Sequence, residues 1–260
     1  MSSDEKIHET VRAYYGQKAR ELTAGEGCCA PSTCDCSTSY SGEALLDIPE
    51  EISLGSFGCA NPLTHASLRE GERVLDLGSG GGLDCFLAAR QVGPTGQVIG
   101  VDMTDEMLDL ATRNSRRLGF EHVEFRRGTI ESIPVDDQSV DAVLSNCVIN
   151  LSPDKPEVFA EIFRVLAPGG RVSLADIVTL GPLSSEYLDQ GDSWAACVAG
   201  ALTIDDYAEG LTRAGFTDVS VLPADGSDWR NVAHGHPISA LITGRKPARS
   251  SFPSEGPGAG

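Results

Sequence analysis

A short glycine-rich segment carries the most readily identified chemistry of this chain. Residues 74–82 read VLDLGSGGG, an apolar run that ends in an acid and a turn. Its glycines at 78, 80 and 82 let the backbone approach a ligand closely, and the helix that follows begins with unpaired N–H groups. Asp102 ends the next apolar run, where a carboxylate can accept hydrogen bonds from both hydroxyls of a ribose. This arrangement predicts a nucleoside-cofactor site.

The spacing of the loop distinguishes between nucleoside cofactors. A dinucleotide site reads G-x-G-x-x-G, whereas this chain reads G-x-G-x-G and places Asp76 two residues before the first glycine. A carboxylate there would repel a pyrophosphate and favours a ligand that bears an amino group. The pattern resembles motif I of the methyltransferases that use S-adenosylmethionine. We therefore expect that cofactor to contact Asp76, Gly78, Ser79, Gly80, Gly82 and Asp102.

The composition excludes several classes of protein. The chain has 260 residues and a formal net charge of −18, which argues against a nucleic-acid partner because phosphates would be repelled. No apolar run reaches the length of a membrane span, and the N-terminal residues MSSDEK are too polar for a signal peptide. We expect a cytoplasmic protein with no membrane contact, and the acidic surface favours a monomer.

Strand and helix patterns alternate through the middle of the chain. Strands are predicted at 73–77, 97–101, 123–126, 142–145, 171–175, 217–222 and 239–244. Helices are predicted at 4–22, 63–68, 83–91, 105–118, 155–166, 184–200 and 203–214, the last with Thr203 as its N-cap. This order is typical of an α/β fold with a Rossmann-like, doubly wound, mostly parallel sheet of seven strands.

The chain is expected to divide into four parts. Residues 1–65 form an N-terminal helix and a Cys-rich extension, and residues 66–180 form the cofactor-binding core. Residues 181–246 form a C-terminal α/β part that binds substrate. Residues 247–260 contain too few apolar side chains to pack and are expected to be disordered.

Topology predicts further cofactor contacts. In open α/β sheets the ligand lies beyond the carboxyl ends of the strands, where the strand order reverses. The segments that follow the first four strands supply Met103, Thr129, Ile130, Glu131 and Asn146. Met103 and Ile130 either sandwich an adenine ring or belong to the ordinary core. Thr129 or Glu131 is placed to meet the exocyclic amine of that ring.

The cysteines are the second candidate for chemistry. Eight cysteines in a chain with a nucleotide-type fold and no secretion signal do not indicate a disulfide framework, but buried, catalytic or ligating thiols. Cys147 follows the fourth strand and, taken alone, is typical of a small buried side chain. Cys59 lies in a glycine-flanked turn, and Cys197 lies in a segment that could cover the crevice. Thiolates are soft ligands, so three of them beside a methyl donor indicate a thiophilic element as the substrate.

Several short segments carry a resemblance to a known family. They are AYYG at 13–16, Gly58-Cys59, residues 74–85, VDMT at 101–104, SNCVINLSPDK at 145–155, RVLAPGG at 164–170 and CVAGAL at 197–202. In these segments the chain resembles the arsenite methyltransferases. The cysteines at 147 and 197 make the resemblance specific, because a methyltransferase of organic molecules needs no cysteine at either place.

The resemblance implies an arsenic site built from thiolates. Cys147 and Cys197 would hold trivalent arsenic, with Cys59 as the third ligand in the early steps. Cys28 or Cys29 corresponds to the N-terminal cysteine of the family. No metal cofactor is implied, because the metalloid is the substrate.

The resemblance also assigns roles to other polar residues. Asn146 and the pair Tyr14 and Tyr15 are candidates for shaping the methyl pocket, with Asn146 and Tyr14 also contacting the cofactor. Cys34 and Cys36 depart from the simplest family pattern, and they either collect arsenite or are loop residues that oxidise readily.

After transfer, the resemblance implies a reductive step. A dithiol such as Cys59 with Cys28 or Cys29 would return arsenic to its trivalent state by forming a disulfide. Thioredoxin or glutathione would then reset the enzyme. The remaining free cysteine of the core, Cys85, is expected to be buried, and His8 and His122 have surface-like contexts.

Two other classes of function remain open. A methyltransferase of an organic acceptor, such as a quinone precursor, keeps the fold and the cofactor but predicts an acid or histidine base near Asn146. It gives the three separated cysteines no role. A protein that only sequesters the metalloid would use the thiols, but it has no need of Asp76, the glycine loop or Asp102.

Overall fold

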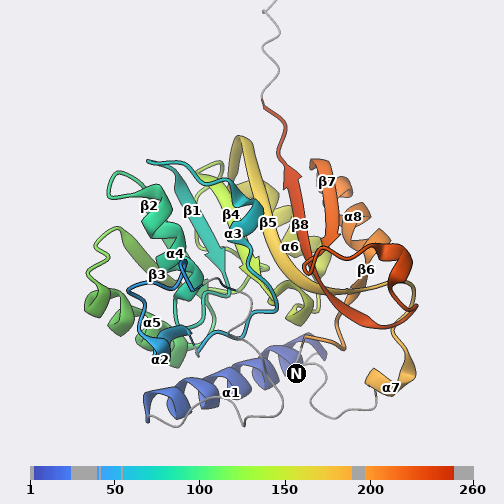
Figure 1. Cartoon of the computed structure of the whole chain (residues 1–260), viewed down its shortest axis with the longest axis horizontal. Helices are drawn as coiled ribbons and strands as arrows, with labels where there is room; N and C mark the ends of the chain where they lie inside the picture. The colour runs from blue at the N-terminus through green and yellow to red at the C-terminus, as the bar shows by residue number, and fades with distance from the viewer. Residues whose placement is uncertain (1–2, 25–39, 41, 54, 189–196, 249–260) are drawn as a thin grey trace, which may run out of the picture.

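The computed structural model describes residues 3–24, 40, 42–53, 55–188 and 197–248 (Figure 1). Within these residues the strands form one sheet of eight strands in the order β3-β2-β1-β4-β5-β8-β7, with the two-residue β6 paired to β5. The strands are β1 (Arg73–Leu77), β2 (Gln97–Asp102), β3 (Val123–Arg127), β4 (Val140–Asn146), β5 (Leu166–Thr179), β6 (Leu202–Thr203), β7 (Thr217–Pro223) and β8 (Pro237–Arg245).

The predicted mostly parallel, doubly wound sheet is confirmed. β1 pairs with β2 and β4 in parallel, and β4 pairs with β5 in parallel, whereas β8 runs antiparallel to both β5 and β7. The chain therefore adds β2 and β3 on one side of β1, and then crosses to the other side of β1 to form β4. The strand order reverses between β1 and β4, so the carboxyl ends of these two strands mark the expected ligand site.

The helices cover the sheet and its carboxyl edge. They are α1 (Ser3–Thr23), α2 (Glu50–Ser53), α3 (Leu63–Ala66), α4 (Leu83–Val92), α5 (Asp105–Leu118), α6 (Lys155–Val165), α7 (Ser185–Leu188) and α8 (Ile204–Arg213), with 3-10 turns at Ile149–Leu151 and Trp229–Asn231. None of these helices is both long enough and apolar enough to cross a membrane, as far as the described residues go.

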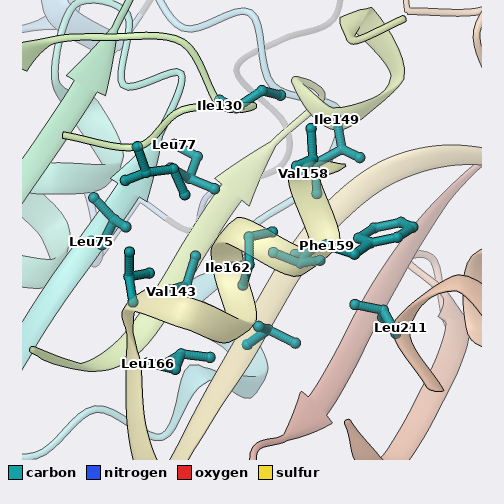
Figure 2. Close-up of a cluster of buried hydrophobic side chains, with 14 of the residues drawn as sticks. Leu75, Leu77, Ile130, Val143, Ile149, Val158, Phe159, Ile162, Leu166 and Leu211 are labelled. Atoms are coloured by element: carbon teal, nitrogen blue, oxygen red, sulfur yellow. The ribbon is translucent and has the colours of Figure 1, made fainter. Parts of the chain in front are cut away.

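Alternation along the strands assigns side chains to two apolar layers. In β1, Val74 joins the layer that α3 and α4 supply, whereas Leu75 and Leu77 join the layer that α6 and α8 supply. α6 contributes Val158 and Ile162, four residues apart on one helix face, and both are fully buried. Figure 2 shows these side chains of α6 lying over those of β1 and β4.

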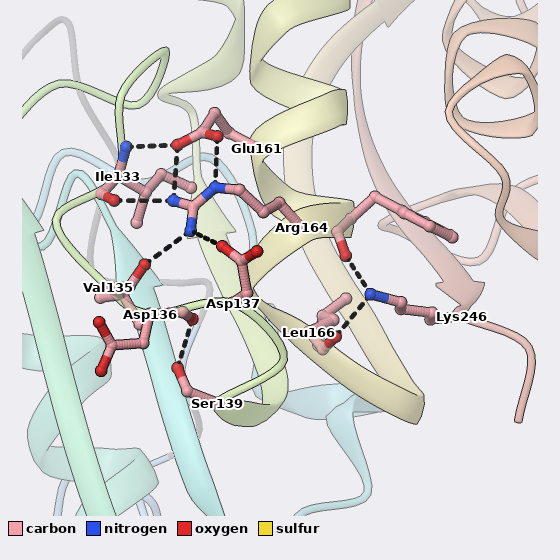
Figure 3. Close-up of polar contacts among 10 residues, drawn as sticks. Ile133, Val135, Asp136, Asp137, Ser139, Glu161, Arg164, Leu166 and Lys246 are labelled. Carbon is pink, nitrogen blue, oxygen red and sulfur yellow. Dashed lines mark hydrogen bonds and ion pairs between the residues drawn. The ribbon is translucent and has the colours of Figure 1, made fainter. Parts of the chain in front are cut away.

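Polar contacts fix the loop that precedes β4 and the start of β5 (Figure 3). The guanidinium of Arg164 donates to the carbonyl oxygens of Ile133 and Val135, both at 2.9 Å, and forms an ion pair with Glu161. Lys246 donates to the carbonyl oxygen of Leu166 at 2.8 Å, beyond the last turn of α6. These contacts join the loop before β4 and the residue after β8 to the end of α6.

Two predicted elements differ from the structure. β5 begins at Leu166 rather than at residue 171, because the backbone of Gly169 and Gly170 exchanges hydrogen bonds with Lys246 and so extends the sheet. The helix predicted over 184–200 is found at 185–188 but not at 197–200, and residues 189–196 lie outside the described residues. α7 ends at Leu188, and residues 197–200 form turns. The tail predicted to be disordered lies outside the described residues, apart from positions 247 and 248.

The N-cap of α8 provides a test of the fold. The hydroxyl of Thr203 accepts a hydrogen bond from the N–H of Asp206 at 3.1 Å. Replacing Thr203 by Ala should lower the free energy of unfolding by about 1 kcal/mol, because that N–H loses its partner. Urea unfolding followed by circular dichroism measures the change.

Thr212→Ala is the matched control for this prediction. Its hydroxyl donates to the carbonyl of Ala208 within the same helix. It should change stability by less than about 0.5 kcal/mol. Equal losses in the two variants would contradict the capping role of Thr203.

Candidate active site

A cavity lies at the carboxyl ends of β1, β2 and β4, where the strand order reverses. Its empty volume, including the open mouth, is about 970 Å³. Small-molecule sites measure roughly 300–1,000 Å³. Its wall includes ten of the residues predicted from the sequence: Asp76, Gly78, Ser79, Gly80, Asp102, Met103, Thr129, Ile130, Asn146 and Cys147. α1 closes one side of the cavity with His8, Val11 and Tyr15. Figure 1 shows this helix passing across the carboxyl ends of the parallel strands.

The glycine loop is shaped mainly by its neighbours. Gly78 has φ +67°, and a side chain there would overlap with Val148, the residue after Cys147. Gly82 does not line the cavity. It has φ +94° before α4, where a side chain would press on Phe86. Only Gly80 has open space around it, so it is the position at which a ligand can approach the backbone.

Ser79 carries an unpaired polar atom in the wall of the cavity. Its side chain is buried, and its hydroxyl oxygen has no hydrogen-bond partner among the described residues. Buried polar atoms are almost always paired in folded proteins. The hydroxyl of Ser79 is therefore available to a ligand.

Four carboxyl groups line the cavity and make it acidic, those of Asp76, Asp84, Asp102 and Glu131. Burial raises the pKa of Asp76 well above its usual range, raises that of Asp84 to about 6, and raises that of Asp102. Among the described residues that line the cavity, none is lysine or arginine. A ligand that carries positive charge would stabilise the ionised carboxylates. The site therefore favours a cationic ligand.

Asp102 is held in a fixed orientation at the end of β2. One carboxylate oxygen accepts from the N–H of Gly80 at 3.0 Å, and the other accepts from the N–H of Thr104 at 2.8 Å. Each carboxylate oxygen can accept a further hydrogen bond. Asp102 can thus bind the glycine loop and a pair of ligand hydroxyls at once.

The candidates for an adenine pocket have mixed surroundings. Ile130 lines the cavity but also belongs to the main apolar core, whereas Met103 packs against the cysteine cluster. Thr129 lines the cavity beside a short bridge to Ser132. Each of these two side chains contacts both the protein interior and the cavity, and their contact with an adenine ring stays a prediction.

Glu131 binds the N-terminal helix. Its carboxylate lies 3.0 Å from the Nε2 atom of His8 and accepts from the hydroxyl of Ser152. Burial raises the pKa of Glu131, but these hydrogen bonds outweigh it and the net pKa is lowered. The surface-like context expected for His8 is corrected. Its side chain lines the cavity and docks α1.

Only one of the two adjacent tyrosines of α1 lines the cavity. Tyr15 lines the cavity, and its ring lies 5.6 Å from that of Phe57, edge to face. Tyr14, predicted to contact the cofactor, is not in the cavity wall. Successive helix residues are separated by about 100°, so the two rings of α1 cannot both face the site. Tyr15, rather than Tyr14, therefore lines the cavity in which the cofactor is expected.

Three cysteines from distant segments meet beside the cavity. Cys147 follows β4, and it forms a disulfide with Cys59 across a Cα–Cα distance of 6.0 Å. The Sγ atom of Cys197 lies 2.7 Å from the carbonyl oxygen of Cys147 and donates to it. All three belong to one apolar cluster that also contains Val11 and Tyr15. The structure therefore describes the cluster in an oxidised form.

The other cysteines are separate from this cluster. Cys85 is fully buried in the core, as predicted, and its thiol donates to Asp76 at 3.1 Å. The predictions for Cys28, Cys29, Cys34 and Cys36 lie outside the described residues.

Asn146 and Asn150 contact the loops that carry the cysteines. Asn146 lines the cavity, but its amide is within hydrogen-bond distance of Cys59, Ala60, Tyr40 and Asp84. Its role in shaping the methyl pocket stays a prediction, and the structure adds a contact with the Cys59 loop. Asn150, to which sequence reasoning gave no role, donates to the carbonyl oxygen of Cys197.

The sequence also left Asp84 and Tyr40 without a role. The hydroxyl of Tyr40 donates to Asp84 at 2.7 Å, in a buried contact between segments 44 residues apart. Asp84 lies within the glycine-rich segment, two residues after Gly82, which was the only signal that could have indicated it. Tyr40 follows a Cys-rich stretch of sequence, and nothing in that context indicates a partner.

Comparisons with known proteins agree with this geometry. A model of the methyltransferase domain matches residues 68–215. The arsenite methyltransferase of Halobacterium salinarum is 44% identical over 94% of this chain and 68% of its own length. The human arsenite methyltransferase is 33% identical over 85% of this chain. The chain spans 61% of the length of that human relative.

A solved structure supports the same relationship. The crystal structure of an arsenic(III) S-adenosylmethionine methyltransferase from Chlamydomonas reinhardtii matches with a TM-score of 0.64 and 34% sequence identity. The match covers 81% of this chain and 74% of that one. Fold, cavity position and sequence thus agree, and the chain belongs to the arsenite methyltransferases within the methyltransferase-domain family.

Proposed function

We propose that this protein transfers methyl groups from S-adenosylmethionine to trivalent arsenic bound by the thiolates of Cys59, Cys147 and Cys197. The observation that carries the proposal is the convergence of these three cysteines in one cluster, of which Cys147 also lines an acidic cavity. They come from segments that lie far apart in the sequence, at positions 59, 147 and 197. An apolar cluster at that place could be built from aliphatic side chains, whereas three sulfur atoms suit a thiophilic element.

The cavity fits S-adenosylmethionine. That cofactor supplies an electrophilic methyl group on a positively charged sulfonium sulfur. Asp76 and Asp84 would face its positive charges, and Asp102 would accept from its ribose hydroxyls. The unpaired hydroxyl of Ser79 and the open space at Gly80 add further contacts. The resident residues thus match both the charge and the hydroxyl groups of the cofactor.

Ligand exchange at arsenic needs no base. Burial raises the pKa of Cys197, and the nearby charge of Asp176 raises it further by a smaller amount. The thiol of Cys197 is therefore protonated at neutral pH. Each As–OH group that meets a thiol forms an As–S bond and releases one water, which carries away the thiol proton. The three thiols together replace the three hydroxyls of arsenite. Trivalent arsenic in this pyramidal site keeps a lone pair for attack on a methyl group, and the protein positions the reactants.

A reductive step follows from the same thiols. Methyl transfer raises arsenic to the pentavalent state, and oxidation of two thiols to a disulfide returns two electrons to it. The pairing of Cys59 with Cys147 supports such a step, in addition to the pairing of Cys59 with Cys28 or Cys29 expected from the sequence. Thioredoxin or glutathione would then reduce the disulfide.

An organic acceptor is the second candidate. Asp84 is an acid near Asn146 of the kind that such a reaction would use as a base, and its pKa is raised to about 6. Its two carboxylate oxygens, however, already accept from Tyr40 and Asn146. An organic acceptor also leaves the three cysteines without a role. If the protein only sequestered arsenic, the acidic cavity would have no role.

The thiolate role is tested by replacing Cys147 with serine. The variant should bind S-adenosylmethionine as the wild type does and lose at least about 90% of arsenite methylation, because hydroxyl oxygen is a poor ligand for a soft element. Purified protein, cofactor and a thiol reductant are incubated with arsenite, and products are separated by arsenic speciation.

Each outcome of that experiment identifies one function. Methylated arsenicals from the wild type alone support the proposal. Tight arsenite binding without methylation by the wild type indicates sequestration. Absence of both binding and product indicates an organic acceptor, and undiminished methylation by the serine variant would show that Cys147 is not a ligand.

The cofactor site is tested at Asp102. Replacing Asp102 by Ala should weaken S-adenosylmethionine binding roughly 10- to 100-fold, because hydrogen bonds to a charged group are lost. Isothermal titration calorimetry measures the affinity. Asp109→Ala on the exposed surface of α5 removes the same charge and is the control. If both variants lost the same affinity for S-adenosylmethionine, the loss would result from the change in net charge and not from a contact of Asp102.

The buried carboxyl of Asp176 gives a pH dependence. It lies in β5, accepts from the N–H of Asn150 at 3.2 Å and interacts electrostatically with Lys155, Cys197 and Tyr207. Burial raises its pKa from 3.8 to about 7. The folded protein holds this proton more tightly than the unfolded chain, so stability is lost as the pH rises from about 4 to 7.

Asp176→Asn should therefore remove this loss. Between pH 4 and 7, the unfolding free energy of the variant relative to the wild type should rise by up to about 1.4 kcal/mol per pH unit. Urea unfolding at a series of pH values measures it, with Asp109→Asn as the exposed control. Parallel stability curves for wild type and Asp176→Asn would refute the raised pKa.

A further inference from the structure

The two loops that carry Cys59 and Cys197 belong to no long element of the fold. Cys59 lies in an irregular segment between α2 and α3, and Cys197 lies in a turn that precedes β6. A thiolate site for a three-coordinate element needs its sulfur atoms at fixed separations. In the reduced protein, where the bond between Cys59 and Cys147 is open, other contacts must therefore hold these loops against Cys147.

Asn146 holds the Cys59 loop from the end of β4. Its Oδ1 atom accepts from the backbone N–H of Cys59 at 3.0 Å, and its Nδ2 atom donates to the carbonyl oxygen of Ala60 at 2.8 Å. The carboxamide thus pairs with the loop through a donor and an acceptor, as a neighbouring strand would. Gly58 packs directly on this amide, since any added Cβ would overlap with it.

Asn150 holds the Cys197 turn in a corresponding way. Its Nδ2 atom donates to the carbonyl oxygens of Ile177 at 2.7 Å and Cys197 at 3.2 Å. Gly200 packs on the backbone of Asn150, where a Cβ would overlap with the carbonyl oxygen. Each asparagine therefore has a glycine partner in the loop that it holds.

The backbone at the cysteines shows why such contacts are needed. Cys147 has φ +58° and Cys197 has φ +63°, in the left-handed region that residues other than glycine rarely occupy. Such a strained residue persists only where its surroundings determine its conformation. The N–H of Cys147 donates to Ala175 at 2.8 Å, and Asn150 secures the carbonyl of Cys197.

From these contacts we propose that Asn146 and Asn150 are positioning residues that fix Cys59 and Cys197, respectively, on either side of Cys147. This inference rests on the proposed thiolate binding of arsenic. Neither amide needs to touch the metalloid. Asn146 determines whether the thiol of Cys59 is available to arsenic. Asn150 determines whether the thiol of Cys197 is available.

The proposal predicts which arsenical each variant loses. Arsenite has three replaceable hydroxyls and can use all three thiols, whereas methylarsonous acid has two and can bind through Cys147 and Cys197 alone. With reduced protein, Asn146→Ala should weaken arsenite binding about as much as Cys59→Ser and leave methylarsonous acid binding unchanged. Asn150→Ala should weaken both ligands, about as much as Cys197→Ser.

Double variants separate positioning from general damage. Adding Asn146→Ala to Cys59→Ser should cause no further loss, so that a coupling of roughly tenfold in affinity appears between the two positions. Asn150→Ala combined with Cys197→Ser should behave in the same way. The crossed pair, Asn146→Ala with Cys197→Ser, should give multiplying losses. Equilibrium binding of arsenite and of methylarsonous acid provides the readout.

The glycines give a second route to the same result. Gly58→Ala and Gly200→Ala change neither asparagine and neither cysteine, and they should reproduce the ligand pattern of Asn146→Ala and Asn150→Ala. A variant that merely misfolds would lose both arsenicals and S-adenosylmethionine together. Losses that multiply in every pair would overturn the proposal. Failure of the reduced wild type to bind arsenite would instead refute the proposed function itself.

Discussion

The five residues from Asn146 to Asn150 connect every part of the site. They leave β4 at the point where the strand order reverses, which places them between the cofactor cavity and the thiol cluster. Asn146 contacts the Cys59 loop, and Asn150 contacts the Cys197 turn. Val148 presses on Gly78 of the glycine loop. A shift of this segment would therefore displace the cofactor loop and all three thiols together.

The acidic cavity imposes the second constraint. Burying carboxyl groups without cationic side chains disfavours their ionised form, and the raised pKa values of Asp76, Asp84 and Asp102 record this cost. A cationic ligand offsets the cost when it binds, so binding and stability are linked. The same argument explains why Asp84 is hydrogen-bonded to Tyr40 and Asn146, since these donors stabilise its charge. Charge complementarity thus favours the methyl donor over neutral or anionic nucleosides.

Sequence patterns predicted the sheet and most of the cavity wall, because strand alternation and the glycine loop are local signals. They were wrong over residues 197–200, which were predicted to end a helix but form the turn that carries Cys197. Tyr14 was chosen over Tyr15 because nothing local shows which helix face meets a distant loop. The amide contacts of Asn146 join residues 87 positions apart, and no spacing rule predicts such a pairing. Long-range hydrogen bonds are thus the part of the site that only the structure provides.

Cys147 occupies the centre of both proposed chemical steps. As a ligand it must be a free thiol, whereas in the structure it is bonded to Cys59. One sulfur cannot do both, so three-thiol binding of arsenic and the disulfide exclude each other. Under the proposed function, each reduction of arsenic through this pair would remove the site that accepts the next arsenite. Turnover then depends on an external thiol to reopen the disulfide, and the redox state of one bond determines whether the protein can bind its substrate.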